Sequence, residues 1–537
     1  MERGTFCTLL ILFEGLLTLV AVVAGCGEAP EPRDTSLASL ETGESVPEVE
    51  TGAHDSTGLE ESDPIEETAS VDTVPIEETA DPWASVLMEC GAWETRLAPV
   101  GSYLVESDAD AIFYVQEDWR QREGVALLQG ALASDVDGDG CSEVLLSGLY
   151  YPEDGGSGVR NVYKVAGPVR GTFLSPGPYS AVVEASYDHN LSQLSLGDLD
   201  GDGSRDDWLL GALHGGDNGL GAVHLFPEPL SGSYVEDDAV ATIWAPDSIA
   251  GTSAGLTTGD ADGDGADDVV LGWYVWGDDG SLVPELGVFS GPLAADSTYE
   301  GSIASFSGIG MWAGEWMTLD ADLDGDGLHD LVYGSKIGGE EPDGLLVFRG
   351  PLEGTCSWED NDLFIETETK VWDKVFFPLS AGPDADGDGY EDLLAGENGD
   401  FYGKAWLVLG GLDPVQNLGD AHAAFTGSSS WSFPYSLSME QDVDADSSPD
   451  VLIGFPGHGW PTEESEGAAL LYYGPIEGAY DLDDADAVFY GSGPGWSYAQ
   501  VGGFVRGLGD TDGDGFDDFL IGGLGTTPAY LFRGGSR

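Results

Sequence analysis

The sequence predicts an all-β fold: a seven-bladed β-propeller of four-stranded antiparallel blades, closed by an N-terminal strand and preceded by a disordered acidic tether. Three observations predict this fold. An acidic nine-residue motif recurs seven times, each copy is surrounded by short strand patterns without helical periodicity, and a segment before the first copy resembles a strand of a late repeat. Repetition at a nearly fixed period is the sequence signature of repeat architectures such as propellers.

The motif has the form Asp-x-Asp-x-Asp-x-x-x-Asp/Glu, and successive copies start 58 to 68 residues apart. This spacing is too regular for coincidence. We number the motifs as loops one to seven by their first residues, which are Asp135, Asp198, Asp260, Asp322, Asp384, Asp442 and Asp510.

Each loop is followed by an apolar run that ends in glycine, such as residues 330–334, and then by a Gly-rich segment. A second apolar run stops at Gly-Pro, as in residues 345–351, and a third run, such as residues 423–427, lies further on. A stretch of small and apolar residues, for example residues 255–259, leads into the next loop. Four short strands per repeat, separated by turn residues, predict one propeller blade.

The two ends of the repeat region predict how the ring closes. After loop seven the chain supplies only part of a blade, and the outermost strand is missing. Residues 108–114 (DADAIFY) nearly copy residues 484–490 (DADAVFY) of the sixth repeat. Residues 108–115 are therefore expected to complete the seventh blade and remove two open sheet edges. The predicted propeller spans residues 108–537, and residues 87–107 form a lead-in segment.

The residue types in the loops point to calcium. Ca²⁺ takes about six to eight oxygen ligands, and a tight loop can supply them from carboxylates at positions one, three, five and nine and a backbone carbonyl at position seven. Up to seven structural ions are expected. The predicted ligands of the seven loops, in this order, are Asp135, Asp137, Asp139, Cys141 and Glu143; Asp198, Asp200, Asp202, Ser204 and Asp206; Asp260, Asp262, Asp264, Ala266 and Asp268; Asp322, Asp324, Asp326, Leu328 and Asp330; Asp384, Asp386, Asp388, Tyr390 and Asp392; Asp442, Asp444, Asp446, Ser448 and Asp450; and Asp510, Asp512, Asp514, Phe516 and Asp518.

Position twelve excludes the EF-hand alternative, because an EF-hand places a bidentate Glu there. These loops instead have apolar or aromatic residues, such as Leu271 and Tyr333, already within the next strand. Loop six departs most from the pattern, since Ala445 and Ser447 replace two glycines and Pro449 precedes the closing Asp. A left-handed conformation at Ser447 would cost about 1 kcal/mol or more, so loop six is expected to bind most weakly.

The repeats resemble the FG-GAP repeats of the integrin α-subunit N-terminal propeller and its bacterial relatives. The sixth repeat carries both namesake stretches, residues 433–437 (FPYSL) before the loop and residues 454–456 (GFP) after it. The resemblance covers about residues 108–537. It implies a propeller with calcium in loops on one face, and it does not imply a particular ligand.

The N-terminal segment indicates export. Residues 1–25 read as a signal peptide, and residues 23–26 (VAGC) resemble the lipobox of bacterial lipoproteins, with lipidation at Cys26. A membrane helix is the alternative, but Glu14 interrupts the apolar run. Residues 26–86, acidic and nearly free of aromatic side chains, are expected to form a disordered linker. The expected location is a bacterial membrane, most simply the outer membrane or cell surface.

The negative net charge and the lack of catalytic sequence motifs limit the classes of function that we expect. The chain has 99 acidic and 17 basic residues and a net charge of −82, which opposes binding to nucleic acid or to an anionic bilayer. No catalytic motif is present, and we expect no catalytic residues. His329, inside loop four, is expected to be solvated. Among Cys90, Cys141 and Cys356 one disulfide is possible in an exported chain, and spacing does not choose the pair.

The expected function is adhesion or recognition of a protein or glycan by a monomer. Strand order places the remaining loops on the face opposite the calcium loops, where aromatic side chains could contact a ligand. The alternative for any one Trp is packing between blades. Rival functions are a calcium-dependent polysaccharide lyase or hydrolase, or an architectural envelope protein. The candidate ligand contacts are Trp273, Trp276, Trp312, Trp316, Trp372, Trp431, Trp460 and Trp496.

Overall fold

The computed structural model describes 97–104, 108–114, 129–132, 135, 140–150, 159–174, 180–185, 191–212, 221–245, 249–277, 281–307, 316–335, 343–367, 378–398, 403–411, 417–427, 433–458, 467–491, 500–523 and 528–537. The chain divides into two units, and the smaller one, Thr18–Pro82, contains no described residue. The predictions for the signal peptide, Cys26 and the linker therefore lie outside the described residues. The account below concerns the other unit.

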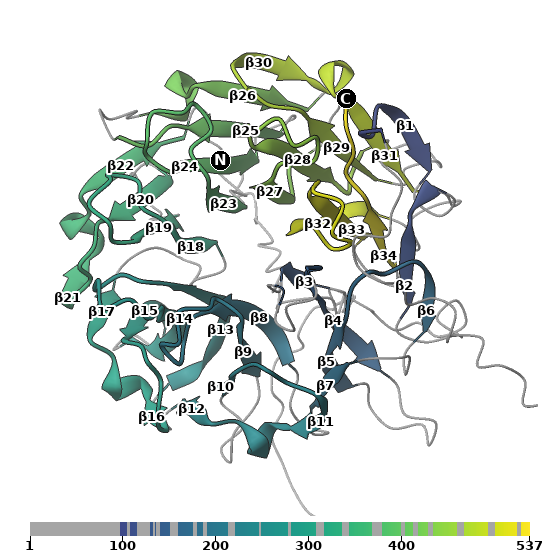
Figure 1. Cartoon of the computed structure of the whole chain (residues 1–537). Helices are drawn as coiled ribbons and strands as arrows, with labels where there is room; N and C mark the ends of the chain where they lie inside the picture. The colour runs from purple at the N-terminus through teal and green to yellow at the C-terminus, as the bar shows by residue number, and fades with distance from the viewer. Residues whose placement is uncertain are drawn as a thin grey trace, which may run out of the picture. The chain divides into compact units, whose positions relative to one another are not determined.

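The described part of this unit is a seven-bladed β-propeller, as predicted (Figure 1). Each blade starts with the strand nearest the centre. The blades, in order, consist of β3 (Gln129–Leu132), β4 (Val144–Tyr150), β5 (Val159–Val165) and β7 (Ala181–Glu184); β8 (Leu191–Gly197), β9 (Asp207–Ala212), β10 (Ala222–Phe226) and β12 (Ala241–Trp244); β13 (Ile249–Gly259), β14 (Asp268–Trp276), β15 (Leu282–Phe289) and β17 (Ala304–Ser307); β18 (Met317–Ala321), β19 (Asp330–Ser335), β20 (Gly344–Phe348) and β22 (Leu363–Glu366); β23 (Leu379–Gly382), β24 (Asp392–Asn398), β25 (Gly403–Val408) and β26 (Ala423–Thr426); β27 (Ser436–Gln441), β28 (Asp450–Phe455), β29 (Ala468–Tyr472) and β31 (Ala487–Tyr490); and β32 (Val501–Gly509), β33 (Asp518–Gly523), β34 (Ala529–Phe532) and β2 (Ala111–Tyr114).

The innermost strands close the ring. Each of β3, β8, β13, β18, β23, β27 and β32 contacts the next, and β32 contacts β3 again. Side-chain hydroxyls add bonds between these strands: Ser438 Oγ accepts from the backbone N–H of Gly507 in the following blade at 2.9 Å. The second strand of each blade is buried on both faces, which explains its continuous apolar sequence; all six residues of β28 are buried.

The N-terminal strand completes the seventh blade, which confirms the predicted closure. β2 pairs antiparallel with β34, with Ala111 opposite Leu531. The lead-in segment also contributes a strand, because β1 (Gly101–Leu104) pairs in parallel with β31 of blade six. Together these pairings form a seam, which we define as β1, β2 and the strands β31 and β34 that they join.

Six blades have a fifth strand that the sequence analysis did not predict. The connection before each outermost strand forms a short strand that pairs in parallel with the outermost strand of the preceding blade. These strands have only two to four residues, too few to produce a recognisable period of apolar residues. They are β1, β6 (Gly171–Leu174), β11 (Gly232–Val235), β16 (Ser297–Thr298), β21 (Gly354–Ser357) and β30 (Gly478–Asp481), and the nearby 3-10 turns are η2 (Glu236–Asp238), η3 (Tyr299–Gly301), η4 (Trp358–Asp360), η5 (Leu418–Asp420) and η6 (Leu482–Asp484).

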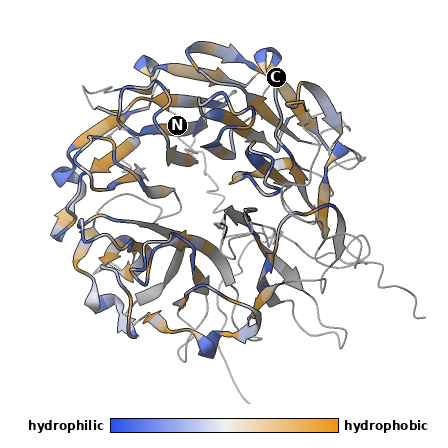
Figure 2. Ribbon diagram, in the orientation of Figure 1, coloured by the Kyte–Doolittle hydropathy of each residue, from blue (hydrophilic) through white to orange (hydrophobic). Residues whose placement is uncertain are grey.

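The core lies between neighbouring blades. Hydrophobic residues follow the strands, and hydrophilic residues gather at the turns (Figure 2). One cluster packs Val332 and Leu345 of blade four against Leu393 and Trp406 of blade five. Fully burying a side chain of this size contributes about 1.5 to 3 kcal/mol, so the blades depend on one another for stability.

Candidate metal centres

The acidic loops join the first and second strands of their blades. In loop three, Asp260 accepts backbone hydrogen bonds from Gly263 to Oδ1 at 2.7 Å and from Gly265 to Oδ2 at 3.1 Å. Both glycines have positive φ, 80° and 92°, a conformation that disfavours other residues. The backbone therefore wraps around the first carboxylate and turns the following ones inward.

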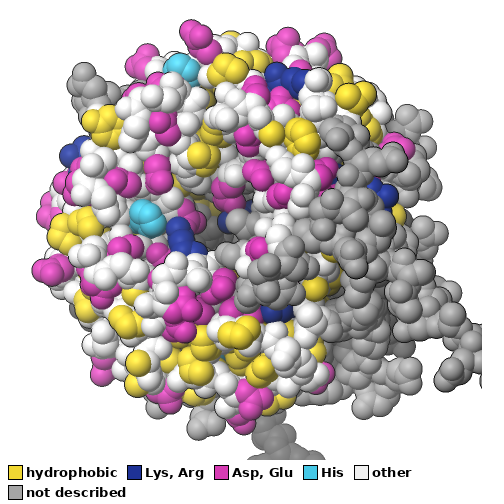
Figure 3. All heavy atoms as spheres, in the orientation of Figure 1, with side chains coloured by type: hydrophobic (Ala, Val, Ile, Leu, Met, Phe, Trp, Pro, Cys, Tyr) yellow, Lys and Arg dark blue, Asp and Glu magenta, His cyan; other side chains and the backbone are white. Residues whose placement is uncertain are grey.

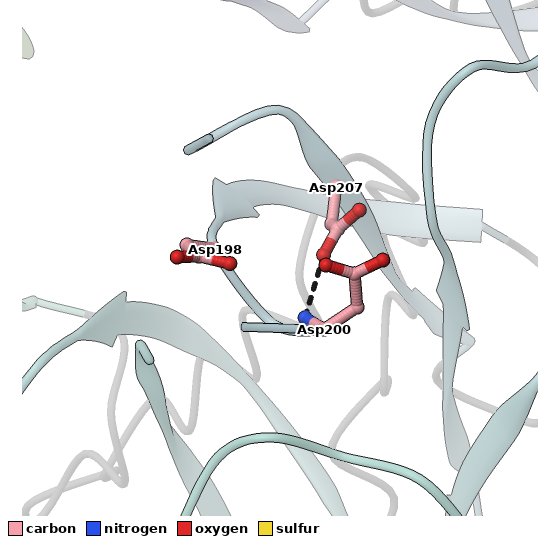
Figure 4. A group of neighbouring side chains, drawn as sticks. All are labelled: Asp198, Asp200 and Asp207. Carbon is pink, nitrogen blue, oxygen red and sulfur yellow. Dashed lines mark hydrogen bonds between the residues drawn. The ribbon is translucent and has the colours of Figure 1, made fainter. Parts of the chain in front are cut away.

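The carboxylates converge in loops two to six. In each of these loops, oxygen atoms from three carboxylates lie within 4.8 Å of one another. Figure 4 shows the group of loop two, with Asp198 facing Asp200 and Asp207. The groups are Asp198, Asp200 and Asp207; Asp260, Asp262 and Asp268; Asp322, Asp324 and Asp330; Asp384, Asp386 and Asp392; and Asp442, Asp444 and Asp450.

The closing carboxylate of loop two differs from the prediction. The motif spacing predicts Asp206, whereas the structure brings Asp207 to this position. Asp207 begins β9, and its Oδ2 accepts the backbone N–H groups of Leu199 and Asp200 at 2.9 Å. Loop two has one residue more than loops three to seven before its second strand begins, so the ninth position of the motif, Asp206, lies one residue before the start of β9.

The closing carboxylates of loops three, four and six are buried. Asp268 and Asp330 have no exposed surface, and burial is the main cause that raises the pKa of each to about 7, against opposing backbone hydrogen bonds. For Asp450, burial likewise raises the pKa to about 8. An apolar residue would pack there without the free-energy cost of burying an ionised carboxylate. A bound cation next to these buried carboxylates would stabilise their ionised form.

This burial predicts how stability depends on pH when calcium is absent. Because the pKa of Asp268 rises from 3.8 to about 7 on folding, the folded protein binds more protons than the unfolded chain between these values. Stability should therefore fall as pH rises from 4 to 7, and Ca²⁺ should reverse this trend by binding the deprotonated form. Melting curves in EDTA at pH 5 and pH 7.5 test this expectation. A higher melting temperature at pH 7.5 would contradict it.

The donor set fits a hard divalent cation. All side-chain donors are carboxylate oxygens, which Ca²⁺ prefers. In loop seven, Oδ2 of Asp514 is buried and has no hydrogen-bond partner among the described residues. A buried carboxylate oxygen without a partner is costly, and a cation bound to it would remove that cost. Asp510, Asp512, Asp514 and Asp518 would hold the ion there, with the Phe516 carbonyl.

Loops one and six differ from the others. Asp137 and Asp139 of loop one lie outside the described residues, while Glu143 is buried. Cys141 is disulfide-bonded and Cys356 is a free thiol, so the partner of Cys141 lies outside the described residues. In loop six, Ala445 and Ser447 have positive φ, 56° and 72°. The backbone strain predicted at Ser447 is thus present.

Position eight links neighbouring loops, a feature that the sequence analysis missed. Oδ2 of Asp267 in loop three accepts the backbone N–H of Asp198, the first residue of loop two, at 2.9 Å. His329 makes the equivalent bond through Nδ1 and so is not simply solvated. Pro449 of loop six has neither a carboxylate nor an N–H group. Among the described residues, two further bonds of this type run from Asp322 N–H to Glu391 and from Asp442 N–H to Asp517, both at 2.8 Å.

The aromatic candidates separate into buried and exposed residues. Trp273 is only 5% exposed, packs on Tyr299 and donates to Glu285, so the structure contradicts its prediction as a ligand contact. Trp316 is half-buried beside the core between blades four and five. Trp276 is 62% exposed. The other five, Trp312, Trp372, Trp431, Trp460 and Trp496, lie outside the described residues.

Charged side chains also surround the central hollow of the ring, whose rim carries basic and acidic groups (Figure 3). Arg205 pairs with Asp267 and Asp320 at 2.8 Å, and Arg506 pairs with Glu440 at 3.1 Å. Burial raises the pKa of Glu440, and Arg506 opposes this shift. Within the described residues, no helix is long and apolar enough to cross a membrane.

Comparison with known proteins shows similarity to integrins. No protein-family model matches the chain. Integrin alpha-PS2 of Drosophila melanogaster is 24% identical over 231 residues, which cover 40% of this chain and 15% of that protein. Integrin alpha pat-2 of Caenorhabditis briggsae is 23% identical over 228 residues, 38% of this chain and 17% of that protein. The chain thus spans less than a fifth of the length of these curated relatives.

Two solved structures show more distant similarity. The Dos1 propeller matches 82% of this chain and 87% of its own, with a TM-score of 0.35 and 10% identity. The α-L-arabinofuranosidase Arb93A from Fusarium graminearum, in complex with an iminosugar inhibitor, matches 80% of this chain and 98% of its own, with a TM-score of 0.36 and 10% identity. The seven acidic loops, the seven blades and the similarity to integrin α-subunits together fit an integrin α-like FG-GAP β-propeller.

Proposed function

We propose that this protein is a calcium-binding, surface-tethered recognition module. Its propeller would hold structural Ca²⁺ in the acidic loops and bind a protein or glycan ligand, as a monomer, on the opposite face. The observation that carries this proposal is the convergence of three carboxylates within 4.8 Å in each of loops two to six. The similarity to integrin α-subunits supports adhesion or recognition as the function class.

The proposed role of the ion is structural. A bound Ca²⁺ would neutralise carboxylates that repel one another and, in loops three, four, five and seven, fix the loop against the preceding loop through position eight. In loop three, Oδ1 of the closing Asp268 accepts from Gly291 at 2.9 Å, so the same carboxylate also anchors the Gly-Pro turn that follows β15. Ion binding would thereby stabilise the acidic loop, the start of β14 and the Gly-Pro turn after β15.

The proposed ligand contact lies at the far end of blade three. β14 runs from Asp268 in the calcium loop to Trp276, a distance of about 26 Å for an extended strand. Trp276 pairs across the hairpin with Leu282, which is 50% exposed. An exposed aromatic ring beside an aliphatic side chain suits stacking on a sugar ring or insertion into a protein pocket.

Substitution of Trp276 tests this contact. Trp276→Ala should weaken ligand binding about 10-fold or more, because truncating an exposed aromatic contact typically costs 1 to 2 kcal/mol, while stability should change little. Glycan and extracellular-protein arrays, probed with and without calcium, provide the measurement. The matched control is Val240→Ala, an exposed apolar residue that lies before β12 at the acidic-loop end of its blade. Normal binding by Trp276→Ala would place the ligand elsewhere.

Glu440 and Asp320 favour a second candidate function, polysaccharide cleavage. Their carboxylates interact electrostatically at the ring centre, where acid and base groups could act together. Incubation of the calcium-loaded protein with a panel of acidic and neutral polysaccharides, followed by analysis of reducing ends and unsaturated products, tests this function. Turnover that Glu440→Gln abolishes would support an enzyme, and retention without turnover would support recognition.

A lipid anchor at Cys26 is proposed for the surface location. Cys26→Ala should abolish diacylglyceryl modification, because the thiol is the acceptor. Gel mobility and partitioning into detergent, measured after expression in a bacterial host, check this expectation, with Cys356→Ala as the control. An unchanged detergent-phase fraction in Cys26→Ala would contradict it.

A further inference from the structure

In three of the acidic loops, an arginine from outside the loop pairs with the carboxylate at position three. In loop four, Nε of Arg349 lies 3.2 Å from Oδ2 of Asp324, the third position of the motif. Arg349 immediately precedes the Gly-Pro turn after β20, so the turn directs its guanidinium back to the loop. At the corresponding place in loop three, the neutral hydroxyl of Ser290 donates to Asp262 at 2.9 Å.

In loop seven the guanidinium also reaches the N-terminal strand. Nη1 of Arg533 pairs with the third-position carboxylate of Asp512, and Nε lies 3.4 Å from Oδ1 of Asp110. The backbone N–H of Arg533 donates to the same Asp110 at 3.3 Å. The side chains of Arg533, Asp512 and Asp110 are only 6%, 2% and 12% exposed. One buried cation therefore connects loop seven to the residue that precedes β2.

Loop six has a similar arrangement on the other side of the seam. Nε of Arg537 pairs with Asp444, whose side chain is 1% exposed. The guanidinium stacks over the ring of Tyr473 at 4.1 Å, and the Tyr473 hydroxyl donates to the carbonyl of Pro99 at 2.8 Å. Pro99 precedes β1. The contacts of Arg537 thus extend to the lead-in segment.

Loops two, three and five differ. Among the described residues, no Lys or Arg pairs with a carboxylate at position one, three, five or the closing position of these loops. Arg205 lies in loop two, but it pairs with Asp267 and Asp320, which are not predicted ligands. In the described part of the chain, the predicted ligand carboxylates of these three loops therefore face one another without a paired Lys or Arg.

We propose that the propeller has two classes of calcium site and that arginine, not calcium, holds its seam together. This inference rests on the proposed function, because it requires that the acidic loops bind Ca²⁺. Loops two, three and five depend on the ion, whereas loops four, six and seven are braced by Arg349, Arg537 and Arg533. A guanidinium beside one ligand repels the incoming Ca²⁺, so the braced loops bind about tenfold or more weakly. The seam stays closed when calcium is scarce.

Hydrogen exchange of the full chain, measured by mass spectrometry in calcium and in EDTA, tests the proposal. Chelation should speed exchange at least about tenfold in β9, β14 and β24, which follow loops two, three and five. Exchange in β2 and β34 should remain slow. Equal acceleration in all blades, or opening that starts at the seam, would overturn the two-class proposal. Exchange and calorimetry that show no response to calcium would overturn the proposed function as well.

A single substitution provides an independent test away from the seam. Arg349→Gln removes the brace of loop four, so calorimetry with CaCl₂ should show one additional tight site, about tenfold stronger than in the parent. Lys404→Gln is the matched control, because it removes one positive charge that lies over the Trp406 ring rather than in a loop. An unchanged number of tight sites in a folded Arg349→Gln protein would overturn the role of arginine, while calcium binding itself would stand.

Discussion

Deletion of residues 108–114 is expected to lower the melting temperature by roughly 15 °C or more, or to abolish cooperative unfolding. This deletion removes β2, whose Ala111 and Phe113 are buried against blades one and seven. It also exposes the edges of β34 and β6, both of which pair with β2. Asp110 is lost too, which leaves the buried Arg533 with one partner fewer. A buried, incompletely paired charge costs several kcal/mol.

The control for this deletion is removal of residues 63–69, seven residues of the acidic linker. Circular dichroism during heating compares both variants with the parent. The linker deletion should melt like the parent, because the composition of that segment predicts no contribution to a hydrophobic core. If the 108–114 deletion also melts like the parent, β2 does not close the ring.

Removal of calcium is the second change with a large expected effect. At a free concentration one hundred times its Kd, a ligand stabilises the folded state by about 2.7 kcal/mol per site. Three such sites, in loops two, three and five, would contribute about 8 kcal/mol, so EDTA should lower the melting temperature by roughly 10 °C or more. The effect should be greater at pH 7.5 than at pH 5, because the closing carboxylates are then deprotonated.

Differential scanning calorimetry with EDTA, followed by return of calcium or magnesium, measures this effect. Calcium should restore the melting temperature and magnesium should restore less of it, because Mg²⁺ requires near-octahedral geometry and keeps several waters. An identical melting temperature with and without EDTA would mean that the loops are stable without an ion. Equal rescue by both ions would argue against a calcium-specific site.

The fold and the loops could be predicted because their signals are local and repeated. Carboxylates at alternate positions with glycine between them must form a tight turn whose oxygens face inward, wherever the turn lies in the protein. The closing strand was predictable for a different reason, since residues 108–114 nearly copy residues 484–490. Their pairing partner then followed from the strand that blade seven lacked.

Features that depend on tertiary contacts could not be predicted. The closing role of Asp207 depends on where β9 begins, and the motif spacing suggested Asp206. Trp273 is buried because Tyr299 of the same blade covers it. The arginine braces join residues far apart in the chain, as Arg533 and Asp110 do. Such pairings leave no periodic trace in the sequence.

A crystal structure of the protein grown with calcium tests the central claim most directly. We predict an ion in loops two, three and five, about 2.3 to 2.6 Å from carboxylate oxygens, with Asp207, Asp268 and Asp392 among the ligands. The ions in loops four, six and seven should have lower occupancy at limiting calcium. Loops two, three and five that remain free of calcium at saturating concentration, with the ring intact, would contradict the claim that calcium stabilises this propeller.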